Sequence, residues 1–139
     1  MSYSSKPQLL VVDDDPSIRE SLGALLTSAG YDVVVAEDGV SAVSHLYRTA
    51  ADLVVTDLNM PGMSGMDLIS HVRSRYPATL ILAMSGDYQG DSVPAAIIAD
   101  RYYPKGQHPH NLLAVIASLI EIQAAEGVYE ISTRPALDS

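Results

Sequence analysis

Short apolar runs alternate with helix-length amphipathic stretches along most of this chain. The apolar runs cover residues 9–12, 33–36, 53–56 and 79–84, and a shorter, more polar run at 100–103 continues the series. Continuous apolar runs of this kind are typical of strands that are buried on both faces, as in a parallel sheet. The pattern therefore predicts an α/β domain with a doubly wound five-stranded parallel sheet and helices on both faces.

The helical stretches carry recognisable start and stop signals. The first begins at Pro16, directly after Asp15, which is a good helix cap. The third opens on Ser64-Gly65-Met66-Asp67, a serine cap with an acid three residues later, and the last is expected to begin near Pro109. The pattern is weakest over residues 86–104, where glycines and a proline leave room for only a short fourth helix and an edge strand.

Size and composition favour one domain in an aqueous compartment. The chain has 139 residues, of which 47% are hydrophobic, and we assign residues 7–126 to the domain, with 1–6 and 127–139 as flexible or docked tails and no output domain. A net charge of −9 argues against direct binding to nucleic acid or to an anionic membrane. The absence of cysteine excludes disulfides and thiolate metal sites. With no signal peptide and no apolar stretch long enough to span a bilayer, a cytoplasmic location is expected.

Two of the apolar runs end in acidic residues. Residues 9–12 lead into Asp13-Asp14, and residues 53–56 lead into Asp57. Open parallel sheets bind ligands at the carboxyl ends of their strands. If the first and third strands are neighbours, the three carboxylates share one site, and their mutual repulsion calls for a cation. Oxygen ligands without histidine or cysteine suit Mg²⁺, with Mn²⁺ as the alternative.

Two further polar residues are expected at the same edge. Ser85 follows the fourth apolar run, and Lys105 follows the fifth. A lysine ammonium and a short hydroxyl are both suited to phosphoryl oxygens. A carboxylate nucleophile, a metal, a lysine and a hydroxyl are nearly all that phosphorylation of an aspartate requires.

These motifs together closely resemble the receiver domain of two-component response regulators, over about residues 7–125. Val12-Asp13-Asp14 is similar to the acidic pair of that family, and the segment from Val55 to Gly62 is similar to the phosphoacceptor motif. The resemblance implies a flavodoxin-like fold with strand order 2-1-3-4-5. It implies the following roles: Asp57 as phosphoacceptor, Asp13, Asp14, Asp57 and the backbone carbonyl of Asn59 as Mg²⁺ ligands, and Ser85, Lys105 and Tyr102 as phosphoryl-binding and switch residues.

The resemblance also implies partners. A sensor histidine kinase or a phosphotransfer protein would donate the phosphoryl group, and an unidentified target protein would bind the switched form. The face built from the fourth helix, fifth strand and fifth helix is the expected binding face and a candidate homodimer interface. The domain would catalyse its own phosphotransfer and dephosphorylation without being an enzyme in the metabolic sense.

Departures from the family pattern leave alternatives open. The residue after Lys105 is Gly106, where the family usually has proline, and Tyr103 competes with Tyr102 for the switch position. Asp87 is a candidate for positioning or repelling an attacking water. A receiver-like interaction module that phosphorylation does not switch is therefore the alternative function. A haloacid-dehalogenase-type phosphatase is disfavoured, because Asn59 stands where that family has a second aspartate.

Overall fold

A computed structural model gives the structure of the protein and describes residues 6–60, 62–85, 99–105 and 110–123. A helix over 110–123 follows the last strand. The other elements, in chain order, are β1 (Gln8–Val12), α1 (Pro16–Ser28), β2 (Asp32–Ala36), α2 (Gly39–Arg48), β3 (Leu53–Asp57), α3 (Gly65–Arg75), β4 (Leu80–Ser85) and β5 (Arg101–Pro104).

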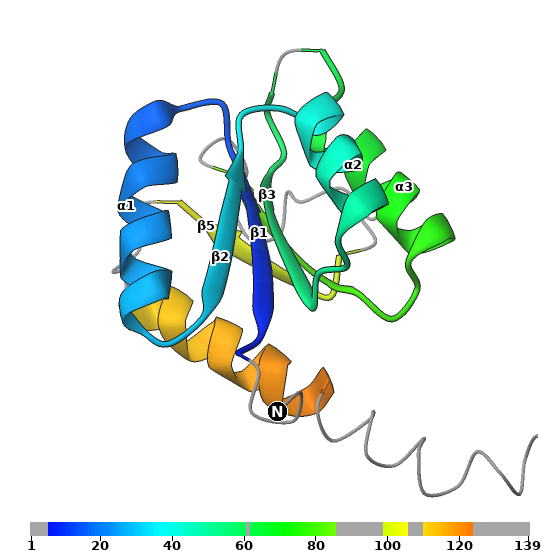
Figure 1. The fold of residues 1–139 in the computed structure, drawn as a ribbon. Helices are drawn as coiled ribbons and strands as arrows, with labels where there is room; N and C mark the ends of the chain where they lie inside the picture. The colour runs from blue at the N-terminus through cyan, green and yellow to red at the C-terminus, as the bar shows by residue number, and fades with distance from the viewer. Residues whose placement is uncertain (1–5, 61, 86–98, 106–109, 124–139) are drawn as a thin grey trace, which may run out of the picture.

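The strands form one parallel sheet in the order β2-β1-β3-β4-β5. This order confirms the predicted topology, and Figure 1 shows the strands side by side with the helices around them. The register pairs Val12 of β1 with Thr56 of β3, so the residues that follow these two strands leave the sheet next to each other. The chain passes from β1 to β2 on one side and then returns to β3 on the other side of β1, so the strand order reverses between the neighbours β1 and β3.

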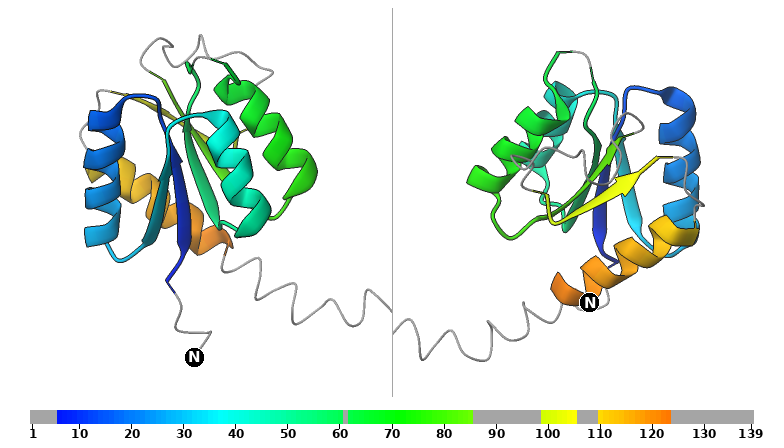
Figure 2. Two further views of the ribbon diagram at one scale, coloured as in Figure 1. Left: turned by 45° about the horizontal axis from the view of Figure 1, so that its top comes forward. Right: turned by 180° about the vertical axis from the view of Figure 1, so that it is seen from behind.

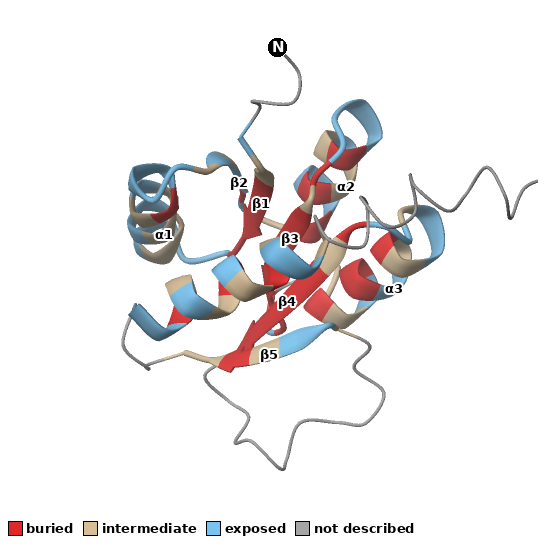
Figure 3. Ribbon diagram, turned by 90° about the horizontal axis from the view of Figure 1, so that it is seen from below, coloured by how far each residue is buried: buried red, intermediate tan, exposed pale blue. Residues whose placement is uncertain are grey.

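The helices cover both faces of the sheet, as predicted. Helix α1 and the helix over 110–123 lie on one face, and α2 and α3 lie on the other (Figures 1 and 2). Alternate residues of each central strand point to opposite faces, so Leu10 and Val54 join the core under α2 and α3, while Leu9 and Val55 join the core under the other two helices. Figure 3 shows the central strands buried along their length.

Helix caps confirm several local predictions. Asp15 caps α1 by accepting a hydrogen bond from the Ser17 N–H, and Ser64 caps α3 by accepting one from the Asp67 N–H at 3.1 Å. Each cap supplies an acceptor for one of the N–H groups that the first turn of a helix leaves without a partner.

Helix α2 buries part of its apolar stretch and exposes the rest. Val40 and Tyr47 belong to its apolar stretch, yet their side chains are 65% and 79% exposed, whereas Ala42 and Leu46 are buried. The helix lies close to β1 and β2, and its buried residues Ala42 and Leu46 join the core that contains Leu10 and Ala36. In the part of the chain that the structure describes, no helix has both the length and the apolar character needed to cross a membrane.

Candidate functional site

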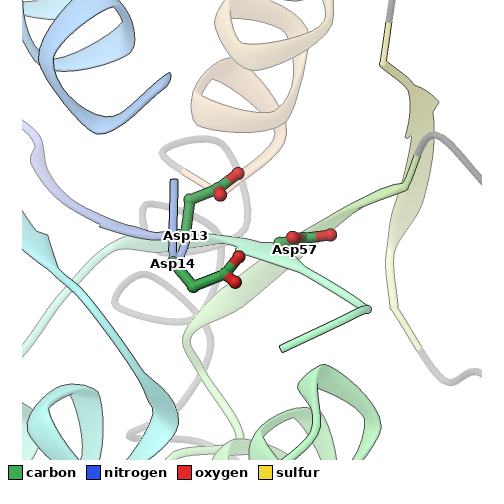
Figure 4. Close-up of side chains that lie close together, drawn as sticks. All are labelled: Asp13, Asp14 and Asp57. Atoms are coloured by element: carbon green, nitrogen blue, oxygen red, sulfur yellow. The ribbon is translucent and has the colours of Figure 1, made fainter. Parts of the chain in front are cut away.

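Three aspartates meet at the carboxyl edge of the sheet. Asp13 and Asp14 follow β1, and Asp57 ends β3, its neighbour in the sheet. Each offers a carboxylate oxygen that lies within 4.8 Å of the other two. Figure 4 shows the three side chains gathered between the ends of the two strands. The structure thus places together the carboxylates that the sequence predicted to share a site.

Two of these carboxylates are buried with few donors. Asp13 is completely buried and Asp57 is 4% exposed, while Asp14 is exposed. One oxygen of Asp13 accepts the N–H of Asp15 at 2.9 Å, but the other, Oδ2, has no hydrogen bond of suitable geometry. Burial of negative charge costs free energy unless positive charge offsets it, so a cation beside these carboxylates would stabilise the arrangement.

Lys105 is the cation that reaches both buried carboxylates. Its ammonium lies 2.9 Å from Asp13 Oδ2 and 3.2 Å from Asp57 Oδ2. Burial alone would lower the pKa of Lys105, but the pairs with the two aspartates outweigh it and the pKa is raised. One ammonium therefore serves two buried carboxylates, with a third nearby.

Burial dominates the electrostatics of Asp57. It raises the pKa of this carboxyl above its ordinary value, although the N–H of Asn59 and the ammonium of Lys105 both act in the opposite direction. The Asn59 N–H donates to Asp57 Oδ1 at 3.1 Å. Ionised Asp57 is thus held at the edge of the sheet at a cost that a nearby cation would reduce.

The residues present fit a hard divalent cation. All three side chains offer oxygen, the ligand that Mg²⁺ prefers, and the two buried carboxylates share one ammonium. Asp13, Asp14 and Asp57 would hold the ion. The predicted ligand role of the Asn59 carbonyl stays a prediction, as does the choice between Mg²⁺ and Mn²⁺.

Ser85 and Tyr102 lie at the other side of the site. Ser85 ends β4 and is completely buried. Its backbone carbonyl accepts both the Lys105 N–H at 3.1 Å and the Tyr102 hydroxyl at 3.2 Å. Tyr103 instead packs into the core on the opposite face of the sheet. The choice between Tyr102 and Tyr103 for the switch position stays a prediction, while Asp87 and Gly106 lie outside the described residues.

Three features of the site were not predicted from the sequence. The Arg19 guanidinium donates to the Asp13 carbonyl at 2.9 Å, and the Asn59 side chain donates to Ser85 Oγ at 2.7 Å. A Cβ on Gly65 would overlap the Asp57 carbonyl oxygen and Leu58 Cα, so only glycine lets α3 begin against the backbone of the site. Two of these features had a signal in the sequence. These signals are an arginine one turn into α1 and a glycine directly after a helix cap.

Comparison with known proteins gives the family of this fold and site. The model of the response regulator receiver domain matches residues 9–117. The chain belongs to this family. Among solved structures, the receiver is similar to chemotaxis protein CheY4 of Vibrio cholerae, with a TM-score of 0.76 and 30% identity over 83% of this chain and 99% of that chain. It is also similar to response regulator TrrA of Thermotoga maritima, solved with Mg²⁺ and BeF, with a TM-score of 0.76 and 31% identity over 81% of this chain and 98% of that one.

Among curated proteins, the receiver is similar to sensory transduction protein RegX3 of Mycolicibacterium smegmatis. The two are 34% identical over 113 residues, which cover 81% of this chain and 50% of that protein. Transcriptional regulatory protein GlrR of Escherichia coli is 40% identical over 97 residues, 69% of this chain and 21% of that protein. The receiver therefore spans about half or less of these curated relatives, and the predicted domain limits of 7–126 remain a prediction.

Proposed function

We propose that this receiver domain accepts a phosphoryl group on Asp57 from a phosphohistidine of a sensor histidine kinase or a phosphotransfer protein, with Mg²⁺ bound beside it. The observation that carries the proposal is the pair of buried carboxylates, Asp13 and Asp57, that share the single ammonium of Lys105. Such a site has a carboxylate nucleophile, a positive group that can pair with the phosphoryl oxygens, and further carboxylate oxygens that can bind a cation.

In the transfer, one bond to phosphorus forms and one breaks. One carboxylate oxygen of Asp57 attacks the phosphorus atom, the bond between phosphorus and the donor imidazole nitrogen breaks, and the imidazole keeps the electron pair. Lys105 pairs with an oxygen of the transferred group and is charged at neutral pH, since its pKa is raised. Bound Mg²⁺ would neutralise charge on the phosphoryl oxygens. Hydrolysis of the aspartyl phosphate would restore the carboxylate without any other enzyme.

The proposed switch uses the contacts on the β4 and β5 side. A phosphoryl group adds nearly two negative charges and three acceptor oxygens to the site. Ser85 would donate its hydroxyl to one of these oxygens, and Tyr102, whose hydroxyl is bonded to the Ser85 carbonyl, would reorient with it. A change at β5 then alters the face that a target protein, or a second copy of the chain, would bind.

Mass spectrometry after incubation with acetyl phosphate and Mg²⁺ tests the proposal. We expect one added phosphoryl group on the wild-type chain and none on Asp57→Asn. Asp52→Asn is the matched control, because Asp52 lies at the opposite edge of the sheet, before β3, and should leave labelling intact. Labelling that persists in Asp57→Asn would refute the assignment of the phosphoacceptor.

Size-exclusion chromatography with Mg²⁺ and beryllofluoride separates this function from its alternative, an interaction module that phosphorylation does not switch. A switched receiver should change its elution volume or its affinity for a partner when beryllofluoride is added. A chain that binds beryllofluoride with no change in either would favour the alternative.

A further inference from the structure

The side chain of Asn59 connects the two sides of the site. Its backbone N–H donates to Asp57 Oδ1 at 3.1 Å, and its side-chain amide donates to Ser85 Oγ at 2.7 Å. The first bond fixes the backbone of Asn59 relative to the phosphoacceptor. The second holds the hydroxyl that the proposed function assigns to the phosphoryl group.

The surroundings of Ser85 make this second bond important. Ser85 is completely buried at the end of β4, and the Lys105 N–H and the Tyr102 hydroxyl both bond to its backbone carbonyl. With the backbone held in this way, the position of the Ser85 hydroxyl depends on its side-chain contacts. Asn59, in contrast, is exposed and reaches the hydroxyl from the loop that follows β3.

We propose that the Asn59 side chain is a latch that holds the Ser85 hydroxyl in its resting position and must release it before Ser85 binds a phosphoryl oxygen. This inference rests on the proposed function. Asn59 is a positioning residue here, because it acts through Ser85 and its side chain transfers nothing itself. Because the Asn59 N–H is bonded to Asp57 Oδ1, its side-chain amide can follow the hydroxyl only by rotation about its own side-chain bonds, and movement of the Ser85 hydroxyl toward a phosphoryl group on Asp57 would break the bond.

A latch of this kind lowers the apparent affinity of the site for a phosphoryl group. Only the fraction of molecules with the hydroxyl released is ready to bind, and the apparent dissociation constant rises by the inverse of that fraction. Removal of one neutral hydrogen bond from the resting state should therefore tighten binding by roughly two- to tenfold. Loss of a residue that merely supported the site would weaken binding instead.

Calorimetric titration with beryllofluoride in saturating Mg²⁺ measures the effect. We expect Asn59→Ala to bind beryllofluoride more tightly than wild type by roughly two- to tenfold. The matched control is Asn111→Ala, since Asn111 is the other asparagine of the chain and is exposed on the helix over 110–123. In a Ser85→Ala background, Asn59→Ala should no longer change the affinity, because the hydroxyl that it holds is gone. Asn111→Ala should leave the affinities for Mg²⁺ and for beryllofluoride at their wild-type values.

The result that overturns the latch is weaker or unchanged beryllofluoride binding by Asn59→Ala, or an equal gain with and without the Ser85 hydroxyl. Thermal unfolding of each variant checks that the fold persists. Phosphoryl labelling of wild type by acetyl phosphate separates the two proposals. If wild type is labelled but Asn59→Ala shows no gain, the latch alone is wrong, whereas absence of both labelling and beryllofluoride binding in wild type would refute the proposed function and the latch with it.

Discussion

Aspartates lie at both edges of this sheet, but their surroundings differ. At the amino edge, Asp52 accepts the Gln8 N–H at 2.7 Å, and Asp100 accepts the Ile81 N–H at 2.7 Å and pairs with Arg73 at 2.7 Å. At the carboxyl edge, one lysine ammonium lies against both Asp13 Oδ2 and Asp57 Oδ2, and Asp14 is a third carboxylate nearby. The aspartates at the amino edge thus have donors of their own and connect strands, whereas the buried aspartates at the carboxyl edge share one cation and can bind a further one.

The largest effect on stability is expected from Asp100→Ala. The change removes the acceptor of the Ile81 N–H at the start of β4 and one partner of Arg73, which lies in the last turn of α3. We expect the free energy of unfolding to fall by about 2 kcal/mol, since the ion pair is partly exposed and contributes only modestly. Urea denaturation measures the change. Asp14→Ala, an exposed aspartate at the carboxyl edge, should change stability by less than about 0.5 kcal/mol. Equal effects of the two variants would contradict the distinction between the edges.

Asp52→Ala should have the next largest effect. It leaves the Gln8 N–H without its acceptor and removes the carboxylate that the Gln123 side chain approaches at 3.4 Å. A loss of about 1.5 kcal/mol is expected, because no full ion pair is broken. Asp52→Asn should cost less, since its amide oxygen still accepts the Gln8 N–H. A larger cost for asparagine than for alanine would show that the negative charge, and not the acceptor, matters at this position.

These two aspartates also show what the sequence could not predict. Asp52 meets Gln8 and Gln123, which are 44 and 71 residues away along the chain. Nothing in the local pattern around Asp52 indicates these partners, because the first depends on the pairing of β1 with β3 and the second on the way the last helix lies across the sheet. The capping roles of Asp15 and Ser64 were predictable, since their partners lie two or three residues away.

Some contacts of the site could likewise be predicted from the sequence, and others could not. The meeting of Asp13, Asp14 and Asp57 followed from strand ends and strand order, both of which the apolar runs and the family resemblance indicated. The hydrogen bond from Asn59 to Ser85 could not be predicted, because it depends on how far the loop after β3 extends toward the end of β4. Strand bounds were predicted to within a residue: β4 runs from Leu80 to Ser85 instead of from Thr79 to Met84.

Addition of Mg²⁺ should stabilise the fold through the carboxyl edge alone. A ligand that binds only the folded state at ten times its dissociation constant adds about 1.4 kcal/mol to the free energy of unfolding. We expect this gain in wild type and in Asp52→Ala, and its loss in Asp13→Asn, which removes the charge of a completely buried carboxylate of the site. Thermal unfolding with increasing Mg²⁺ measures it. A gain that survives in Asp13→Asn would place the ion elsewhere.

The smallest effect, and the most direct test of the comparison, is expected from Asp57→Asn in the absence of Mg²⁺. Burial raises the pKa of Asp57 above its reference value of 3.8, although Lys105 and the Asn59 N–H act against it. The folded protein therefore binds this proton more tightly than the unfolded chain. The resulting stabilisation is complete below pH 3.8 and is lost as the pH rises through the folded pKa.

At pH 7 the wild type thus carries the full cost of a buried carboxylate, and asparagine avoids it while its amide oxygen can still accept the Asn59 N–H. We expect Asp57→Asn to be more stable than wild type at pH 7 by up to about 1 kcal/mol, and the advantage to shrink as the pH is lowered toward 4. Urea denaturation of both proteins across this range measures the difference. If the variant is less stable at pH 7, the pair between Asp57 and Lys105 outweighs the burial of the carboxylate. The carboxyl edge would then stabilise its aspartates as the amino edge does, and the lack of donors would no longer distinguish the site.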